Sequence, residues 1–202
     1  MGILIRRCFG LLFGIAMLVG GAGTSTAHDA PSHRELLLQV DDTATVGVIR
    51  YSLVGNEVTA LLKTYDLDRD GRLGPKEGRL LASVMAQKAV VGLRLSLGKS
   101  PLPWKFVMAD VEAMGKDAKK ISVKGLCEWP HSNDASRLRD TLALEVGQRY
   151  GTLHLQMQTL GSWLVKSVSA GSVSTDSRGI KGRLDLASGK KWNATLERKA
   201  EK

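Results

Sequence analysis

Three aspartates at alternate positions, Asp66, Asp68 and Asp70, stand between two stretches of helical periodicity. Gly71 follows them directly, and Glu77 closes the run a few residues later. Carboxylates crowded together repel one another unless a cation lies between them, and a glycine permits the positive-φ turn that other residues adopt only at a cost. We therefore expect this run to wind around a cation, and to be mobile when it is empty.

Each side of this run carries the pattern of an amphipathic helix. Before it, a helix is predicted to begin near Asn56, which we expect to cap it. After it, a helix is predicted from Pro75 to about residue 91, because proline at the first helical position loses no hydrogen bond. Leu81 and Met85 continue the helical spacing of that second segment. The apolar positions of the first helix are three and four apart: Val58, Leu61, Leu62 and Tyr65.

Residues 66–77 resemble the calcium-binding loop of the EF-hand family, and with both flanking helices the resemblance covers residues 57–91. It implies that Asp66, Asp68 and Asp70 supply side-chain oxygens, Arg72 its backbone carbonyl, and Glu77 two carboxylate oxygens. Calcium takes about six to eight oxygen ligands in a flexible geometry. We expect a Ca²⁺ site here, with Mg²⁺ as the weaker alternative because it demands tighter octahedral coordination.

The resemblance departs from the family in one respect, since EF-hands normally occur in pairs. Residues 110–121 and 134–145 begin with aspartate, but neither has the pattern of a second loop. Leu73 occupies the position that in this family faces a partner loop, and Gly74 leaves its ligand position to a water. The hand is thus expected either to pack on the rest of its own chain or to pair with another molecule, with calcium acting as a structural clip.

The N-terminus has the layout of a secretory signal peptide. Arg6 and Arg7 precede an apolar run at residues 8–19, and small residues surround a cleavage site after Ala27. The run is too short and too rich in glycine for a confident membrane span, although a retained anchor is the alternative. We expect cleavage, a periplasmic or secreted location, and a mature chain that is not integral to a membrane.

The cysteines and histidines offer weaker candidate sites. Two cysteines, Cys8 and Cys127, exclude a disulfide scaffold and a four-thiolate zinc site. Cys127 with His131 could form a nucleophilic pair, but a buried thiol at a strand end is the plainer interpretation. Cleavage would leave His28 at the N-terminus, where it could chelate copper with His33, or simply be solvated.

The remainder of the chain is predicted to be largely β. Residues 34–40 and 45–54 are expected to form a hairpin around the turn at 41–43. Leu153 and Leu155 alternate with polar residues, as in a half-buried antiparallel strand. Further strands are predicted at residues 93–97, 104–111, 121–127, 141–146, 152–158, 163–168, 180–186 and 192–196.

These elements predict an α+β fold, in which one EF-hand helix–loop–helix follows an N-terminal β-hairpin and precedes an antiparallel β-sandwich-like part. The expected division is a signal peptide at residues 1–27, a hairpin and EF-hand module at 28–130, and an antiparallel β part at 131–202. The tryptophans are expected to pack the β core: Trp104, Trp129, Trp163 and Trp192.

The formal net charge of +9 directs attention to anionic partners. Basic runs at residues 116–120 and 198–202 could attract anionic envelope polymers or lipid headgroups, or could be solvated turns and tails. A nucleic-acid role is not expected for an exported protein. The sequence contains no nucleophile elbow, zinc-protease motif, P-loop or dinucleotide-binding fingerprint, so we expect a protein that is not an enzyme.

A looser resemblance covers the hairpin, the acidic loop between helices and the β-rich remainder. This order resembles the extracytoplasmic region that precedes the membrane part of some HupE/UreJ-type bacterial proteins. The sequence thus predicts an exported calcium-binding protein with a structural or interaction role, with a protein or anionic envelope partner. A calcium-dependent enzyme subunit and an envelope metal-handling accessory protein are the alternatives.

Overall fold

The structure, a computed structural model, describes residues 33–114, 120–131, 139–148, 151–169, 175–176, 179–180 and 184–199. Several expectations lie outside these residues. They concern the signal peptide at residues 1–27, copper chelation by His28, most of the basic run at 116–120, and the end of the C-terminal basic run.

The described chain opens with the predicted hairpin. Strand β1 (His33–Val40) pairs antiparallel with β2 (Ala44–Val54). Asp41 forms the turn, because its Oδ1 accepts hydrogen bonds of 2.7 Å from the backbone N–H groups of Thr43 and Ala44. An aspartate that binds the backbone just after it is a common turn former, so local chemistry sets this hairpin.

Two helices follow the hairpin, as predicted: α2 (Asn56–Tyr65) and α3 (Pro75–Val90). Pro75 is the first helical residue of α3, which confirms its expected place. The prediction that Asn56 caps α2 was wrong. Gly55 takes the N-cap position with φ of 66° and no side-chain cap, so Asn56 already belongs to the helix.

The larger sheet has eight strands in the order β10-β11-β8-β1-β2-β6-β5, with β12 also paired to β8. Its strands after the hairpin are β5 (Phe106–Met114), β6 (Lys120–Pro130), β8 (Leu153–Thr159), β10 (Thr175–Asp176), β11 (Gly179–Ile180) and β12 (Leu184–Leu186). The strand predicted at 180–186 is represented by β11 and β12, because residues 181–183 lie outside the described part.

The second sheet has five strands in the order β4-β3-β7-β13-β9, and all of its pairings are antiparallel. They are β3 (Leu93–Leu97), β4 (Ser100–Pro101), β7 (Arg139–Val146), β9 (Trp163–Val168) and β13 (Lys191–Arg198). The fold is therefore mixed α+β, with two helices among the described residues and two antiparallel-rich sheets.

One pairing departs from the expected antiparallel arrangement. Strand β8 lies parallel to β1, with Leu36 opposite Leu155 and Leu38 opposite Met157. All four side chains are buried, because the alternation of both strands points them into the same core. The larger sheet thereby joins strands from both sides of residue 130, where the sequence suggested a division.

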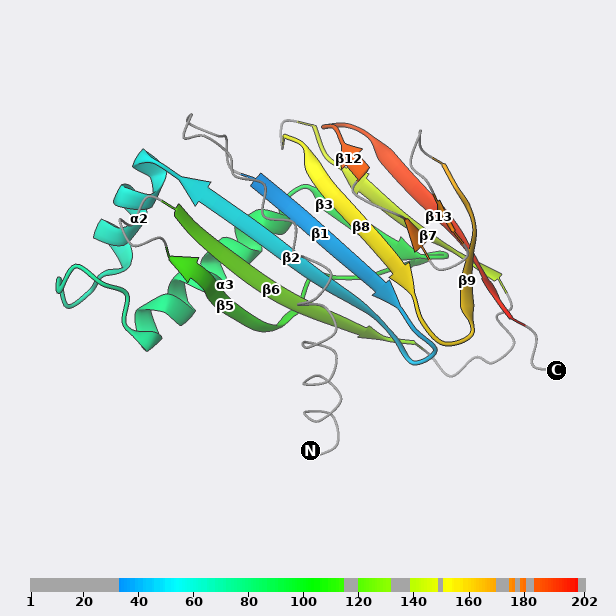
Figure 1. Ribbon diagram of the computed structural model, residues 1–202, viewed down its shortest axis with the longest axis horizontal. Helices are drawn as coiled ribbons and strands as arrows, with labels where there is room; N and C mark the ends of the chain where they lie inside the picture. Colours follow the sequence, from blue (N-terminus) through cyan, green and yellow to red (C-terminus); the bar gives the residue numbers. More distant parts are fainter. Residues whose placement is uncertain are drawn as a thin grey trace.

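The two sheets lie face to face and share one core (Figure 1). Leu36 and Leu38 of β1 belong to the same cluster as Trp192 and Leu196 of β13. Burial of such side chains from both inner faces is what holds a β-sandwich together. The helices lie at one end of the molecule in Figure 1, beside β2, β5 and β6.

A buried arginine joins the larger sheet to α3. Arg34 of β1 is 5% exposed, and its Nη1 donates to the carbonyl oxygens of Ala89 and Val91, each at 3.3 Å. Carbonyls at a helix C-terminus lack intrahelical partners and carry partial negative charge. Arg34 therefore fixes the end of α3 against the first strand.

Within the described part of the chain, no helix combines the length and the apolar character that crossing a membrane requires.

Candidate functional site

The loop between α2 and α3 gathers the three predicted aspartates. One carboxylate oxygen from each of Asp66, Asp68 and Asp70 lies within 4.8 Å of the other two. Asp66 ends α2, where its backbone N–H donates to the carbonyl of Leu62 at 2.8 Å. A set of oxygen ligands at this spacing can hold a hard cation such as Ca²⁺.

Backbone hydrogen bonds orient these carboxylates toward the interior of the loop. Asp66 accepts from the N–H groups of Asp70 (3.1 Å) and Gly71 (2.9 Å). Asp68 also accepts from Asp70, at 3.2 Å, and Asp70 accepts from Arg72 at 2.8 Å. The loop is therefore preorganised by its own backbone, and each aspartate retains lone pairs for a further partner.

Two residues turn the loop through the left-handed region. Gly71 has φ of 82°, as its position in the sequence predicts, and no heavy atom lies near its missing Cβ. Arg69 has φ of 60° and is the one non-glycine residue with positive φ in the described chain. No residue pattern in the sequence predicts this conformation of Arg69.

Glu77 has a role that the sequence analysis missed. It is 7% exposed, and its Oε1 accepts from the N–H groups of Leu67 (2.5 Å) and Asp68 (3.3 Å). Its Oε2 accepts from the N–H of Gly74 at 2.7 Å, as a capping glutamate in the first turn of a helix does. Glu77 thus ties the start of α3 to the start of the loop. The spacing of Gly74 and Glu77 could have predicted half of this role.

The charges in the loop raise the pKa of one carboxyl group. The backbone N–H of Asp70 lowers the pKa of Asp68, but desolvation, the charges of Asp70 and Glu77, and a hydrogen bond with Asp66 together raise it above its ordinary value. Crowded negative charge disfavours ionisation, and a bound cation reverses that effect. The loop therefore concentrates negative charge that a bound cation could neutralise.

The loop and its helices pack on their own chain. Leu73 is half-buried against an apolar cluster that includes Val58 of α2, Leu81 of α3 and Ile121 of β6. The helix pair therefore leans on the β part of its own chain, and pairing of the loop with another molecule stays a prediction. Arg72, the predicted carbonyl ligand, has an exposed side chain.

Cys127 and His131 do not form a catalytic pair in a shared cavity. Cys127 is fully buried on β6, and burial raises the pKa of its thiol to about 12, although a hydrogen bond with the backbone of Lys105 opposes this. His131 lies at the end of β6 in a cavity whose lining does not include Cys127. The thiol is a core group, as in the plainer interpretation.

We expect Cys127 to be unreactive in the folded protein. A thiol with a raised pKa and no solvent access yields little thiolate, which is the reactive form. A disulfide reagent such as Ellman's reagent should modify the Cys127 thiol slowly in native buffer. The reaction in denaturant should be at least about 100-fold faster. Rapid modification in native buffer would contradict the buried position.

The half-buried imidazole of His131 predicts a loss of stability in mild acid. Burial lowers the pKa of His131 below its ordinary value of 6.5, and the charge of Arg198 adds to this, while Asp41, Asp42 and Asp140 oppose it. The unfolded chain then binds more protons than the folded one below about pH 6.5, so stability present above that pH is lost as the pH falls through the lowered pKa. Urea unfolding between about pH 7.5 and about pH 5 should show a steeper decline for the wild type than for His131→Gln. Equal slopes would contradict a half-buried imidazole that stays neutral in the folded protein.

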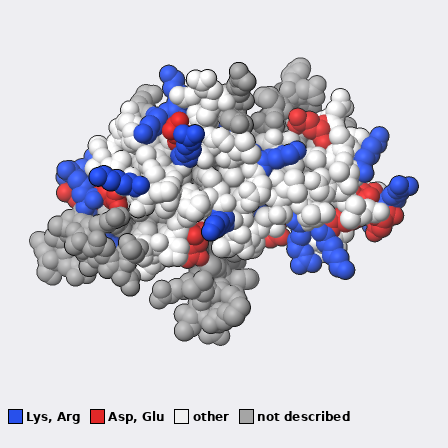
Figure 2. Space-filling view, turned by 180° about the vertical axis from the view of Figure 1, so that it is seen from behind, with Lys and Arg blue, Asp and Glu red and all other residues white. Residues whose placement is uncertain are grey.

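The surface charges are dispersed on the face shown in Figure 2. Lys and Arg side chains stand there in several separate groups, with Asp and Glu among them. An anionic polymer as partner remains a prediction from the net charge.

Comparisons of the chain with protein-family models, with curated proteins and with solved structures find no match.

Proposed function

We propose that this chain is an exported calcium-binding protein of EF-hand type, in which Ca²⁺ serves as a structural clip. The observation that carries the proposal is the convergence of Asp66, Asp68 and Asp70 within 4.8 Å of one another, in a loop turned by Gly71. Its location outside the cytoplasm rests on the signal-like N-terminal sequence.

The donor set suits calcium. Asp66, Asp68 and Asp70 would hold the ion with carboxylate oxygens, and Arg72 would add its backbone carbonyl. Glu77 would contribute once calcium competes with the backbone N–H groups that it now accepts from. Oxygen ligands of this number favour Ca²⁺ over Mg²⁺, which keeps more of its water and tolerates less distortion.

The packing of α3 supports a clip over a sensor. Leu81, Ala82 and Met85 are at most 2% exposed, and Ala89 is fully buried. In sensor EF-hands, calcium opens the angle between the helices and exposes an apolar groove. Such an opening here would pull a core-forming face of α3 away from the sheet, at a large cost in buried apolar area.

Calorimetric titration of the mature chain tests the proposal. We expect Ca²⁺ to bind with a Kd on the order of 10⁻⁴ to 10⁻³ M, and Mg²⁺ to bind at least about tenfold more weakly. Asp68→Asn keeps an oxygen that can accept from Asp70 and removes one charge, so it should weaken calcium binding by at least about tenfold while leaving the calcium-free protein folded.

Asp110→Asn is the matched control, because Asp110 is an exposed aspartate on β5 outside the loop. It should leave the calcium titration unchanged. Absence of any heat at millimolar calcium, or an equal effect of the two substitutions, would refute the proposal.

A further inference from the structure

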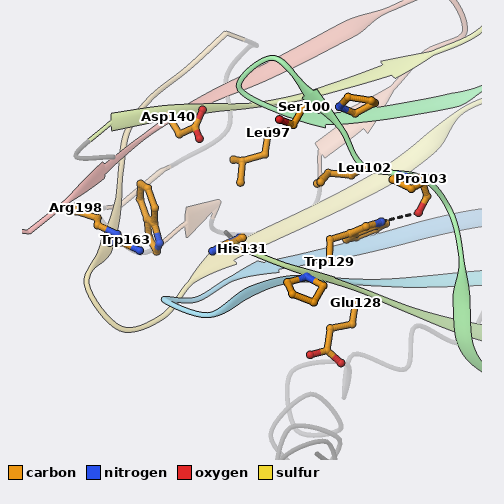
Figure 3. A pocket seen from close by; sticks show the side chains of 12 residues that line it. Leu97, Ser100, Leu102, Pro103, Glu128, Trp129, His131, Asp140, Trp163 and Arg198 are labelled. Atoms are coloured by element: carbon orange, nitrogen blue, oxygen red, sulfur yellow. Dashed lines mark hydrogen bonds between the residues drawn. The ribbon is translucent and has the colours of Figure 1, made fainter. Parts of the chain in front are cut away.

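A cavity of about 370 Å³ lies between the two sheets (Figure 3). The strand ends that line it are at the end of the sandwich opposite the helices in Figure 1. This volume is within the range of small-molecule sites. Nothing in the proposed calcium function uses it. Its lining residues are Leu97, Ser100, Pro101, Leu102, Pro103, Glu128, Trp129, Pro130, His131, Asp140, Trp163 and Arg198.

One end of the cavity gathers nitrogen atoms that lack an acceptor. His131 Nδ1, Trp163 Nε1 and Arg198 Nε are buried, and none has a hydrogen-bond partner in the structure. The three groups are neighbours. The Arg198 guanidinium carbon lies 4.9 Å from the centre of the Trp163 ring, and the His131 ring meets that ring edge-on at a centroid distance of 6.5 Å.

All three nitrogens can act as donors. The indole and guanidinium nitrogens carry hydrogen and cannot accept. The other imidazole nitrogen of His131, Nε2, lies 2.9 Å from the hydroxyl of Thr45, a fully buried residue. When that hydroxyl donates to Nε2, the proton of the neutral imidazole is on Nδ1. Buried donors without an acceptor are rare in folded proteins and indicate an acceptor that completes the site.

The charge at this end is mixed: the carboxylates of Asp41, Asp42 and Asp140 act on His131, and Arg198 is the cation that an anionic acceptor would meet. Arg198 contacts the backbone carbonyl of Asp42 at 3.5 Å, and within the described chain no carboxylate forms an ion pair with it. Asp140 also lines the cavity, but it takes part in another interaction. The carboxylate of Glu128 points away from the other lining side chains in Figure 3. A half-buried arginine is stabilised best by a carboxylate or another oxyanion.

The rest of the cavity is mainly apolar, with Ser100 as a further polar residue of the lining. Trp129 presents its ring, since its Nε1 already donates to the carbonyl of Pro103 at 2.6 Å (Figure 3). Leu97 and Leu102 complete this wall. A ligand that fills the cavity therefore needs an apolar body as well as an anionic end.

We propose that this cavity binds a small monocarboxylate with an apolar body. Its carboxylate contacts Arg198, Trp163 and His131, and its body packs against Leu97, Leu102 and Trp129. The three nitrogens have almost no accessible surface in the structure, so the ligand engages them through a small rotation of the half-buried His131 and Arg198 side chains.

Titration of the mature chain with straight-chain monocarboxylates of about four to ten carbons, followed by NMR of the tryptophan side-chain N–H signals, tests this proposal. We expect at least one acid to bind with a Kd on the order of 0.1–1 mM and to shift the Trp163 signal. The primary alcohols of the same lengths should bind at least about tenfold more weakly, because they lack the charge that Arg198 requires.

Variants separate the anionic contact from the apolar one. Arg198→Gln should weaken binding of the acid by about tenfold or more, and Trp163→Phe, which keeps a ring but removes its N–H, by about threefold to tenfold. Lys166→Gln is the control, since Lys166 is an exposed cation on β9 that pairs with Glu197 at 3.1 Å. It should bind the acid as the wild type does.

Each variant is first compared with the wild type by thermal unfolding, and Trp163→Phe remains informative if Arg198→Gln does not fold. The proposal is overturned if no acid binds, if alcohols bind as tightly as acids, or if folded Arg198→Gln and Trp163→Phe both bind the acid unchanged. These outcomes do not depend on whether the loop binds calcium.

Discussion

Replacing Glu77 with alanine is expected to lower the free energy of unfolding by about 3 kcal/mol without any divalent ion. The Glu77 carboxylate accepts from the backbone N–H groups of Leu67, Asp68 and Gly74, and hydrogen bonds to a charged group are among the stronger ones. Alanine leaves these donors without their acceptor. Urea unfolding in a chelating buffer measures the change, and calorimetry should show that calcium binding is lost as well.

Glu57→Ala is the control for this prediction. Glu57 also lies in the first turn of a helix, but it is exposed. Among the described residues, no backbone N–H donates to its carboxylate as three do to that of Glu77. Its replacement should cost less than about 1 kcal/mol. If both variants lost the same stability in chelator, the carboxylate of Glu77 would have no special role in holding the loop.

Replacing Trp192 with alanine is expected to lower the free energy of unfolding by about 4 kcal/mol. Trp192 is fully buried on β13, the strand that pairs with both β7 and β9. Its removal leaves a cavity in the core shared by the two sheets. Domains are stable by only about 5–15 kcal/mol, so this loss should be visible as a large fall in the urea midpoint.

Trp192→Phe separates the loss of volume from the loss of the indole nitrogen. Trp192 Nε1 is buried without a hydrogen-bond partner in the structure, so phenylalanine removes an uncompensated polar group while keeping a ring in the core. We expect phenylalanine to cost less than half as much as alanine. Equal losses would indicate that the nitrogen has a partner in solution.

The sequence predicted the elements that depend on neighbouring residues. Pro75 begins α3 because a proline at that position sacrifices no hydrogen bond, and Gly71 turns the acidic loop because it tolerates positive φ. The hairpin around Asp41 follows from a side chain that binds the backbone next to it. These preferences act over a few residues and can be recognised in the chain itself.

Contacts between residues distant in the sequence could not be predicted from it. Nothing in residues 33–40 indicates that their second edge pairs with residues 153–159, or that Arg34 reaches the end of α3. The cavity shows the same limit, because Trp129, Trp163 and Arg198 come from strands distant in sequence. The three candidate aspartates could be predicted because they lie within five residues of one another in the sequence. The hydrogen bonds of Glu77 to the backbone could not, because they depend on the folded shape of the loop.

The parallel neighbour of β1 has a consequence for the order in which the polypeptide can fold. As the chain becomes available for folding from its N-terminus, β1 and β2 can form a hairpin early, but β1 keeps a free edge until residues 153–159 can pair with it. Unpaired strand edges are sites where nascent chains associate wrongly. Completion of this sheet therefore waits until most of the chain is available for folding.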